Sequence, residues 1–119
     1  MTEDKLEQRT DKILDQAVDI AKKLSELIEK SGKVKREDKE ALADSLLEWL
    51  IYAGNVKITL EQRYRLKMVE LESEGYSHAS AENRAKTTRE YELFKKIEML
   101  YSLGEERIRL TKISLTNNY

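Results

Sequence analysis

The sequence predicts an all-α protein, a bundle of four to five helices in which the first and last helices are long. The 119 residues include no proline, so the residue type that most strongly breaks a helix is absent. Leu, Ile and aromatic residues recur at helical spacing. Gly32, Gly54 and Gly75 each follow such a segment, where glycine commonly ends a helix. We expect residues 1–119 to form a single helical domain.

The first helix is expected over about residues 3–30, ended by Ser31 and Gly32. Acidic residues crowd its first turn and Lys30 closes its last turn, as the helix dipole favours. Its apolar stripe is broad enough for a bundle and wider than a two-stranded coiled coil requires. The stripe contains Leu6, Ile13, Leu14, Ala17, Ile20, Ala21, Leu24, Leu27 and Ile28.

A second helix is expected over about residues 37–53, with Gly54 and Asn55 ending it. Near Trp49 this segment is apolar almost all round, so we expect it at the centre of the fold. Its main stripe contains Leu42, Leu46, Trp49, Leu50 and Ala53.

Thr59 and Gln62 have the spacing of a capping box, and they predict a third helix over about residues 60–74. Gly75 should end that helix. Ser77 then predicts the cap of a short helix over about residues 78–86.

Thr87 and Glu90 form a second predicted capping box, which opens a last helix over about residues 88–114. Gly104 lies inside this helix at a cost of roughly 1 kcal/mol relative to Ala, which a close helix crossing or a bend would explain. One face of the helix contains Tyr91, Phe94, Ile97, Tyr101, Gly104, Ile108 and Leu115.

The first and last helices would each be about 40 Å long at a rise of 1.5 Å per residue. Helices of that length are long for a compact monomer of this size. They would pack along each other or extend into a partner, and we therefore expect a homo-oligomer or a complex with another protein.

The composition excludes several classes of function. The chain carries 22 basic and 23 acidic residues, a balance that argues against a general polyanion binder and against an acidic mimic of nucleic acid. It has no Cys for disulfide or thiolate chemistry. The longest apolar run, residues 49–53, is too short to span a membrane, and the acidic start lacks the apolar core of a signal peptide. We expect a soluble, cytoplasmic protein without a membrane partner.

The sequence offers no catalytic, cofactor-binding or metal-binding residues. His78 is the only histidine, and no third group is in view to orient its ring beside Ser77 or Ser80. Zinc requires Cys or several His ligands, which the chain lacks. Asp44 and Glu48 are spaced to converge on one helix face, but they lie away from the apolar stripe and are better interpreted as solvated. We therefore expect a protein that is not an enzyme.

The leading functional hypothesis is protein–protein interaction through the second helix. Trp49, Ile51 and Tyr52 make that helix apolar on more sides than one core can cover. Interfaces draw most of their energy from a few large side chains, so we assign Ile51 and Tyr52 to partner binding and Trp49 to the core.

The alternative hypothesis is an accessory protein of replication or recombination that binds nucleic acid. Arg84, Lys86 and Arg89 would contact phosphates, and nearby tyrosines would stack on bases. Against it, acidic residues lie at ion-pair spacing from several basic residues of the second half. These pairs are Glu61 with Arg65, Glu92 with Lys96, and Glu105 with Arg109.

Residues 74–85, with the sequence EGYSHASAENRA, are followed by a charged helix. This arrangement resembles a helix, Gly-x-Ser, short helix and long helix pattern of small all-helical accessory proteins of tailed phages. The resemblance covers about the second half of the chain and identifies no functional residue. It implies a phage or mobile-element accessory or inhibitor protein that binds a partner's surface in the host cytoplasm.

Overall fold

The computed structural model describes the backbone of residues 2–117 and the side chains of residues 12–113. Over residues 2–117 the chain forms four helices and no strand, so the predicted all-α bundle with long first and last helices is confirmed. The helices are α1 (Thr2–Ser31), α2 (Arg36–Ser73), α3 (His78–Ala85) and α4 (Arg89–Asn117). The side chains of Leu6 and Leu115, assigned above to apolar faces, lie outside the described residues.

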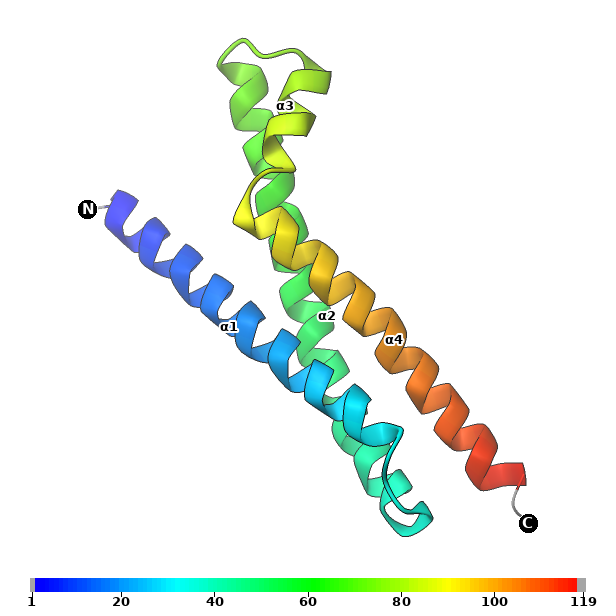
Figure 1. Ribbon diagram of the computed structural model, residues 1–119. Helices are drawn as coiled ribbons and strands as arrows, with labels where there is room; N and C mark the ends of the chain where they lie inside the picture. The colour runs from blue at the N-terminus through cyan, green and yellow to red at the C-terminus, as the bar shows by residue number, and fades with distance from the viewer. Residues whose placement is uncertain (1, 118–119) are drawn as a thin grey trace.

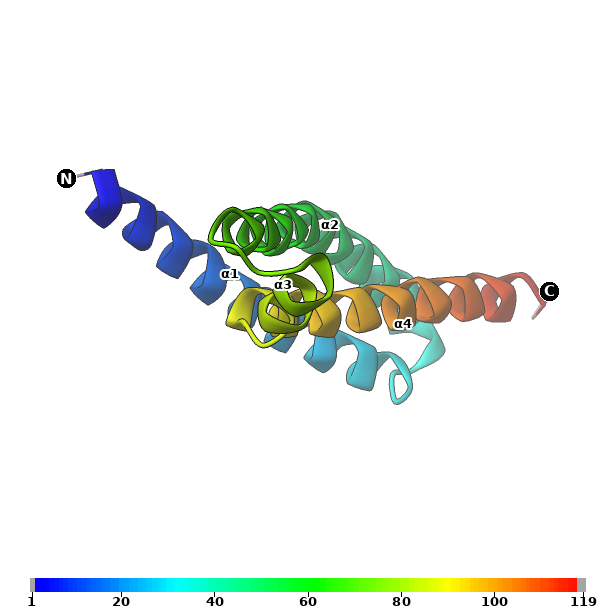
Figure 2. The ribbon, with the colours of Figure 1, turned by 90° about the horizontal axis from the view of Figure 1, so that it is seen from above.

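Three long helices form the body of the molecule, which measures 62 × 32 × 17 Å along its principal axes. α1 and α4 run in one direction and α2 runs in the other (Figure 1). Seen from above, α1 and α4 lie on the same side of α2 (Figure 2). α3 packs on the far end of α2, beyond the main contact with α4. α2 is therefore the central helix, in contact with each of the others.

α2 is one continuous helix, and the prediction of two helices separated at Gly54 and Asn55 is wrong. Gly54 does not adopt a positive φ. Thr59, predicted as an N-cap, instead donates its hydroxyl to the carbonyl of Asn55 at 3.2 Å, inside the helix. A glycine in a helix costs only about 1 kcal/mol. Burial of apolar side chains on both sides, including Leu50 and Leu60, outweighs that cost.

The predicted end of this helix near Gly75 is confirmed. Gly75 has a φ of 105°, a left-handed conformation that glycine adopts without strain. The backbone N–H of Gly75 donates to Glu72 at 3.1 Å and that of Tyr76 donates to Leu71 at 3.2 Å, which together form a Schellman motif. Ser77 then caps α3 as predicted, because its hydroxyl accepts from the backbone of Ser80 at 3.2 Å.

The last helix begins one residue later than its predicted capping box. Thr88, not Thr87, accepts from the backbone N–H of Tyr91 at 3.3 Å. The hydroxyl of Thr87 instead donates to the carbonyl of Arg84 at 2.7 Å, at the end of α3. The hydroxyl of Thr88 also donates to the carbonyl of Ala85 at 2.7 Å, so both threonines contact the end of α3 but only Thr88 caps α4. Sequence spacing alone does not show which of the two caps α4.

The core lies among α1, α2 and α4, and it contains no buried charged or polar residue among the described side chains. α2 does not bury its apolar residues on all sides, although its sequence is apolar almost all round. Trp49 is only partly buried at the edge of the core. The fully enclosed side chains of the core include Ala17, Leu24, Leu46, Ala53, Leu60 and Ile97.

α2 and α4 cross at close range where each contributes a glycine. A Cβ atom added to Gly104 would lie 2.8 Å from Cδ2 of Leu50, a distance that side chains do not tolerate without movement. A Cβ atom added to Gly54 would lie 3.6 Å from Cε2 of Tyr101, an ordinary contact. The close crossing predicted from Gly104 is therefore present, and Leu50 fills the space that a larger residue would occupy.

These two glycines give a matched test of the crossing. We expect Gly104→Ala to lower the free energy of unfolding by about 1–2 kcal/mol, because overpacking against buried Leu50 exceeds the gain in helix propensity. Gly54→Ala should raise it by up to about 1 kcal/mol, because the added methyl group fits and helix propensity improves. Urea unfolding of both variants measures the difference. Equal stabilisation by the two substitutions would show that the crossing is not tight at Gly104.

Candidate protein-binding surfaces

Large hydrophobic side chains are exposed along two of the long helices. Exposed apolar residues that stand alone are normal, whereas contiguous lines of them commonly mark binding surfaces. On α2 the exposed residues are Leu47, Ile51, Tyr52, Ile58, Leu66 and Val69, and on α4 they are Met99, Leu103, Leu110 and Ile113.

The first line of exposed residues follows α2 on the face opposite the core. At 3.6 residues per turn, Leu47, Ile51, Ile58 and Val69 project within about 40° of one another, and Leu66 lies one turn before Val69. We call these five residues the α2 outer stripe. They point away from the buried face of the same helix, so α2 has two apolar faces. This explains why its sequence is apolar almost all round without being buried all round.

Acidic residues flank the first half of the α2 outer stripe. The carboxylate of Glu48 accepts a hydrogen bond from the hydroxyl of Tyr52 at 3.3 Å. Glu61 pairs with Arg65 at 2.9 Å. Together with these two, the flanking acids are Glu40 and Asp44. Among the residues of α2, this part of the surface is therefore apolar along its centre and mostly acidic beside it, whereas Arg109 and Lys112 of α4 line the hollow next to Leu47 and Ile51.

The second line of exposed residues follows α4. Met99, Leu103, Leu110 and Ile113 are separated by four, seven and three residues, which is the spacing of the a and d positions of a heptad. We call them the α4 outer stripe. Glu106 occupies the intermediate position and pairs with Arg109. The apolar face predicted above for this helix is its buried face, and the signal for the outer stripe is its heptad spacing, which is present in the sequence.

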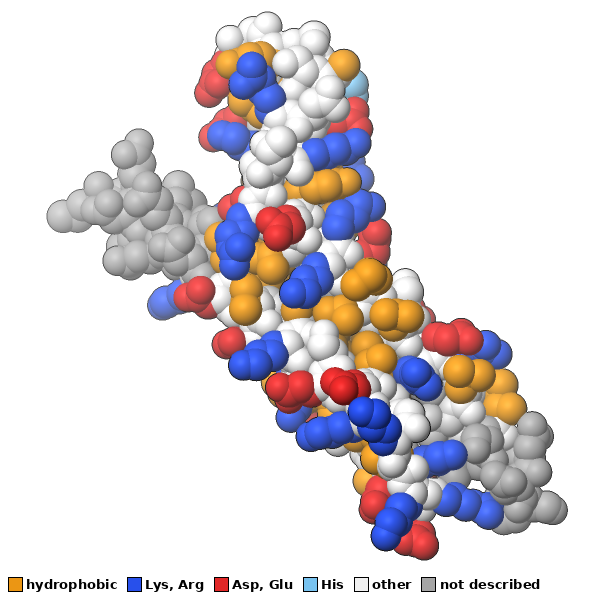
Figure 3. All heavy atoms as spheres, in the orientation of Figure 1, with side chains coloured by type: hydrophobic (Ala, Val, Ile, Leu, Met, Phe, Trp, Pro, Cys, Tyr) orange, Lys and Arg blue, Asp and Glu red, His pale blue; other side chains and the backbone are white. Residues whose placement is uncertain are grey.

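Basic residues flank the α4 outer stripe, in contrast to the acids along α2. Figure 3 shows hydrophobic side chains along the lower right of the molecule, where α4 runs, with several Lys and Arg side chains and fewer Asp or Glu side chains beside them. The flanking basic residues are Lys95, Lys96, Arg107 and Arg109. Lys95 pairs with Glu98 at 3.1 Å, and this hydrogen bond raises the pKa of the Lys95 ammonium group.

Ile51 and Tyr52, the residues assigned to partner binding, are both exposed but do not form one patch. Ile51 is 61% exposed and lines a hollow on the α4 side of α2 together with Leu47. Tyr52 is 45% exposed and lines a separate hollow on the α1 side together with Ile13. Adjacent residues of a helix point about 100° apart, so the two side chains face different neighbours.

Trp49 lies at the edge of the core beside Tyr52. The two rings meet edge to face, with their centroids 5.4 Å apart. The ammonium group of Lys23 on α1 lies 6.0 Å from the centre of the Trp49 ring. Trp49 therefore covers the contact between α1 and α2 and is not exposed on the outer face.

The residues of the nucleic-acid hypothesis already make local contacts. The guanidinium of Arg84 lies over the ring of Tyr76, 4.2 Å from its centre. The ammonium group of Lys86 is 2.8 Å from the carboxylate of Glu82, and this hydrogen bond raises the pKa of Lys86. Arg89 begins α4.

The tyrosines that would stack on bases are also engaged within the fold. Tyr64 is buried and packs against Tyr91, with ring centroids 4.8 Å apart. Tyr101 packs against the core and borders Gly54. A groove that combines free cations with exposed aromatic rings, as single-stranded nucleic acid requires, is not formed by these residues.

Among residues 12–113, the titratable side chains near the single histidine do not converge on a reactive centre. The two ring nitrogens of His78 face different carboxylates, Glu72 at 2.7 Å and Glu82 at 3.9 Å, so the three groups do not converge on one point. Within the described part of the chain, no cluster of three His, Cys, Asp or Glu side chains could hold a metal ion.

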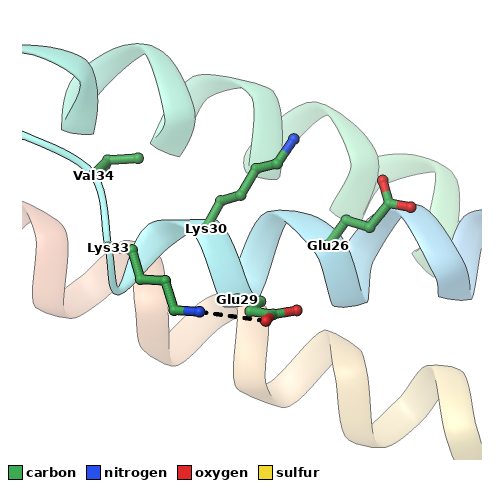
Figure 4. Close-up of a pocket in the computed structure, with 5 residues that line it drawn as sticks. All are labelled: Glu26, Glu29, Lys30, Lys33 and Val34. Atoms are coloured by element: carbon green, nitrogen blue, oxygen red, sulfur yellow. Dashed lines mark hydrogen bonds and ion pairs between the residues drawn. The ribbon is translucent and has the colours of Figure 1, made fainter.

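The charged hollow at the end of α1 is a surface depression. Figure 4 shows that Lys33 pairs with Glu29 across its edge, at 3.5 Å. Glu26, Lys30 and Val34 complete its lining, and none of the five side chains is a nucleophile activated by a base.

Comparison with protein-family models, with curated proteins and with solved structures finds no match for this chain. None of the described helices combines the length and the apolar character that crossing a membrane would require. The surfaces described above are therefore the basis for any proposal about function.

Trp49 and Ile51 differ in solvent exposure, so substitutions at these two positions should have different effects on stability. We expect Trp49→Ala to lower the free energy of unfolding by about 2 kcal/mol or more, because it removes ring contacts at the junction of α1 and α2. Ile51→Ala should change it by less than about 0.5 kcal/mol, because the side chain is largely exposed. Thermal and urea unfolding measure both variants. If Ile51→Ala is as destabilising as Trp49→Ala, Ile51 belongs to the core and the outer stripe is misplaced.

Proposed function

We propose that this protein is a non-enzymatic interaction factor that binds another protein through the α2 outer stripe. One observation carries the proposal: five exposed apolar residues, from Leu47 to Val69, follow the side of the central helix that points away from its buried face. At a rise of 1.5 Å per residue this line is about 33 Å long. Soluble monomers rarely expose several large apolar side chains along one helix face unless that face binds something.

The shape and chemistry of the stripe suit a helical partner. Leu47 and Ile51 border a hollow whose other wall is formed by Tyr101 and Ile108 of α4, so an apolar side chain of the partner can insert beside the stripe. Helices that dock in this way use apolar anchors spaced at three and four residues. In this proposal Ile51 makes the main contact with the partner. Tyr52 faces α1 and lies at the edge of the binding surface.

The biological setting of this proposal rests on the sequence alone. The resemblance of residues 74–85 to accessory proteins of tailed phages favours an accessory or inhibitor protein that occupies a partner's surface in the host cytoplasm. The alternative of nucleic-acid binding has no comparable support, because Arg84 and Lys86 are engaged by Tyr76 and Glu82.

The test is affinity capture from an extract of the organism that encodes the protein, followed by quantitative mass spectrometry. Ile51→Lys places a charge beside Leu47 in the first part of the stripe, at the hollow where the partner would insert, and we expect it to reduce capture of the partner at least about tenfold. Ser25→Lys adds the same charge at an exposed position of α1 and should retain the partner. Thermal midpoints close to that of the parent protein must accompany both results.

Two outcomes would contradict the proposal. One is a folded Ile51→Lys variant that captures the same proteins as the parent. The other is capture that depends on nucleic acid, falls steeply with salt, and is lost in a variant with Arg84, Lys86 and Arg89 changed to Ala.

A further inference from the structure

The two outer stripes of this chain carry opposite charge at their edges. On α2 itself, the charges beside Leu47, Ile51 and Ile58 are predominantly acidic, with Asp44 and Glu48 closest to the first two. On the side that faces α4, Arg109 and Lys112 line the hollow next to Leu47 and Ile51. Around the α4 outer stripe the charges are predominantly basic, with Lys96 beside Met99 and Leu103, and Arg107 and Arg109 beside Leu110. Glu106, the one acidic residue at a heptad position between Leu103 and Leu110, is paired with Arg109. Complementary charges at the edges of two apolar seams select which seams pair.

The two stripes also match in spacing. Leu47, Ile51 and Ile58 are separated by four and seven residues, and Met99, Leu103 and Leu110 repeat the same separations. Both sets therefore hold the a and d positions of a heptad, the pattern by which two helices pack knobs into holes. The segments that share this spacing, residues 47–58 of α2 and residues 99–110 of α4, are each about 17 Å long, so each can cover the other.

Pairing of like stripes is disfavoured by the same charges. Two α4 stripes would bring Lys96 and Arg107 of each copy together, and two α2 stripes would bring Asp44 and Glu48 of each copy together. Like charges across such a seam are destabilising and act against that pairing. Within one molecule the stripes cannot meet, because α2 and α4 contact each other through their inner faces at Leu50 and Gly104.

We propose that the α4 outer stripe of one molecule packs against the α2 outer stripe of a second copy, so that the chain self-assembles head to tail. This inference rests on the proposed function, because it requires that the α2 outer stripe binds a protein. It adds that the protein bound there is a second copy of this chain. The contact joins two different surfaces, and repetition of such a contact produces a ring or a filament.

The decisive experiment uses one defective variant for each stripe. Ile51→Lys puts a positive charge where the basic-edged α4 stripe would dock, and Leu103→Glu puts a negative charge where the acidic-edged α2 stripe would dock. Both positions are exposed, so both variants should fold, and circular dichroism and thermal midpoints check this. Sedimentation velocity then measures the mass of each protein alone and of the two mixed in equal amounts.

We expect the parent protein to show a mass above 13.9 kDa that increases with concentration, and each variant alone to remain at 13.9 kDa. The equimolar mixture should form a species of twice 13.9 kDa and nothing larger, because each variant retains the one stripe that the other lacks. Ser25→Lys, the charge-matched control, should assemble like the parent.

Three results would overturn the inference: a monomeric parent protein, a mixture of the two variants that stays monomeric, or Ile51→Lys that still self-assembles. The last would indicate pairing of like α4 stripes. A monomeric parent that loses a captured protein on Ile51→Lys would overturn head-to-tail assembly and leave the proposed function standing. Failure of both tests would remove the α2 outer stripe as a binding surface.

Discussion

The close crossing of α2 and α4 is the contact on which the rest of the structure depends. Leu50 occupies the space above Gly104, and Tyr101 lies against Gly54, so each helix offers a glycine to a large side chain of the other. Because a helix cannot rotate without moving these contacts, the crossing fixes the rotation of both helices about their axes. The rotation of the two helices then determines which of their residues face the core and which face solvent.

The same constraint connects the fold to the proposed binding surfaces. With its inner face against α1 and α4, α2 directs Leu47, Ile51 and Ile58 outward. With Gly104 against Leu50, α4 directs its heptad line outward as well. The two long helices therefore each have one apolar face in the core and another at the surface, and the surface faces differ in the charge at their edges.

Local signals in the sequence predicted local structure well, whereas properties that depend on neighbouring helices were harder to predict. Gly75 and Ser77 were predicted correctly because a left-handed glycine and a capping serine act within a few residues. Gly54 was assigned as a helix end, but burial on both sides of it decides the outcome, and that burial depends on α4. Ile51 and Tyr52 were grouped as neighbours in sequence, yet helix rotation directs them to different sides of α2.

The most direct test of the central claim is a nuclear Overhauser measurement on protein with labelled Leu methyl groups. The crossing predicts strong signals from the Leu50 methyl groups to the Hα protons of Gly104, and from the Tyr101 ring to Gly54, in the same sample. It also predicts helical chemical shifts without interruption through residues 54–60. Absence of the Leu50–Gly104 signal, or a break in helical shifts at Gly54 and Asn55, would contradict the account.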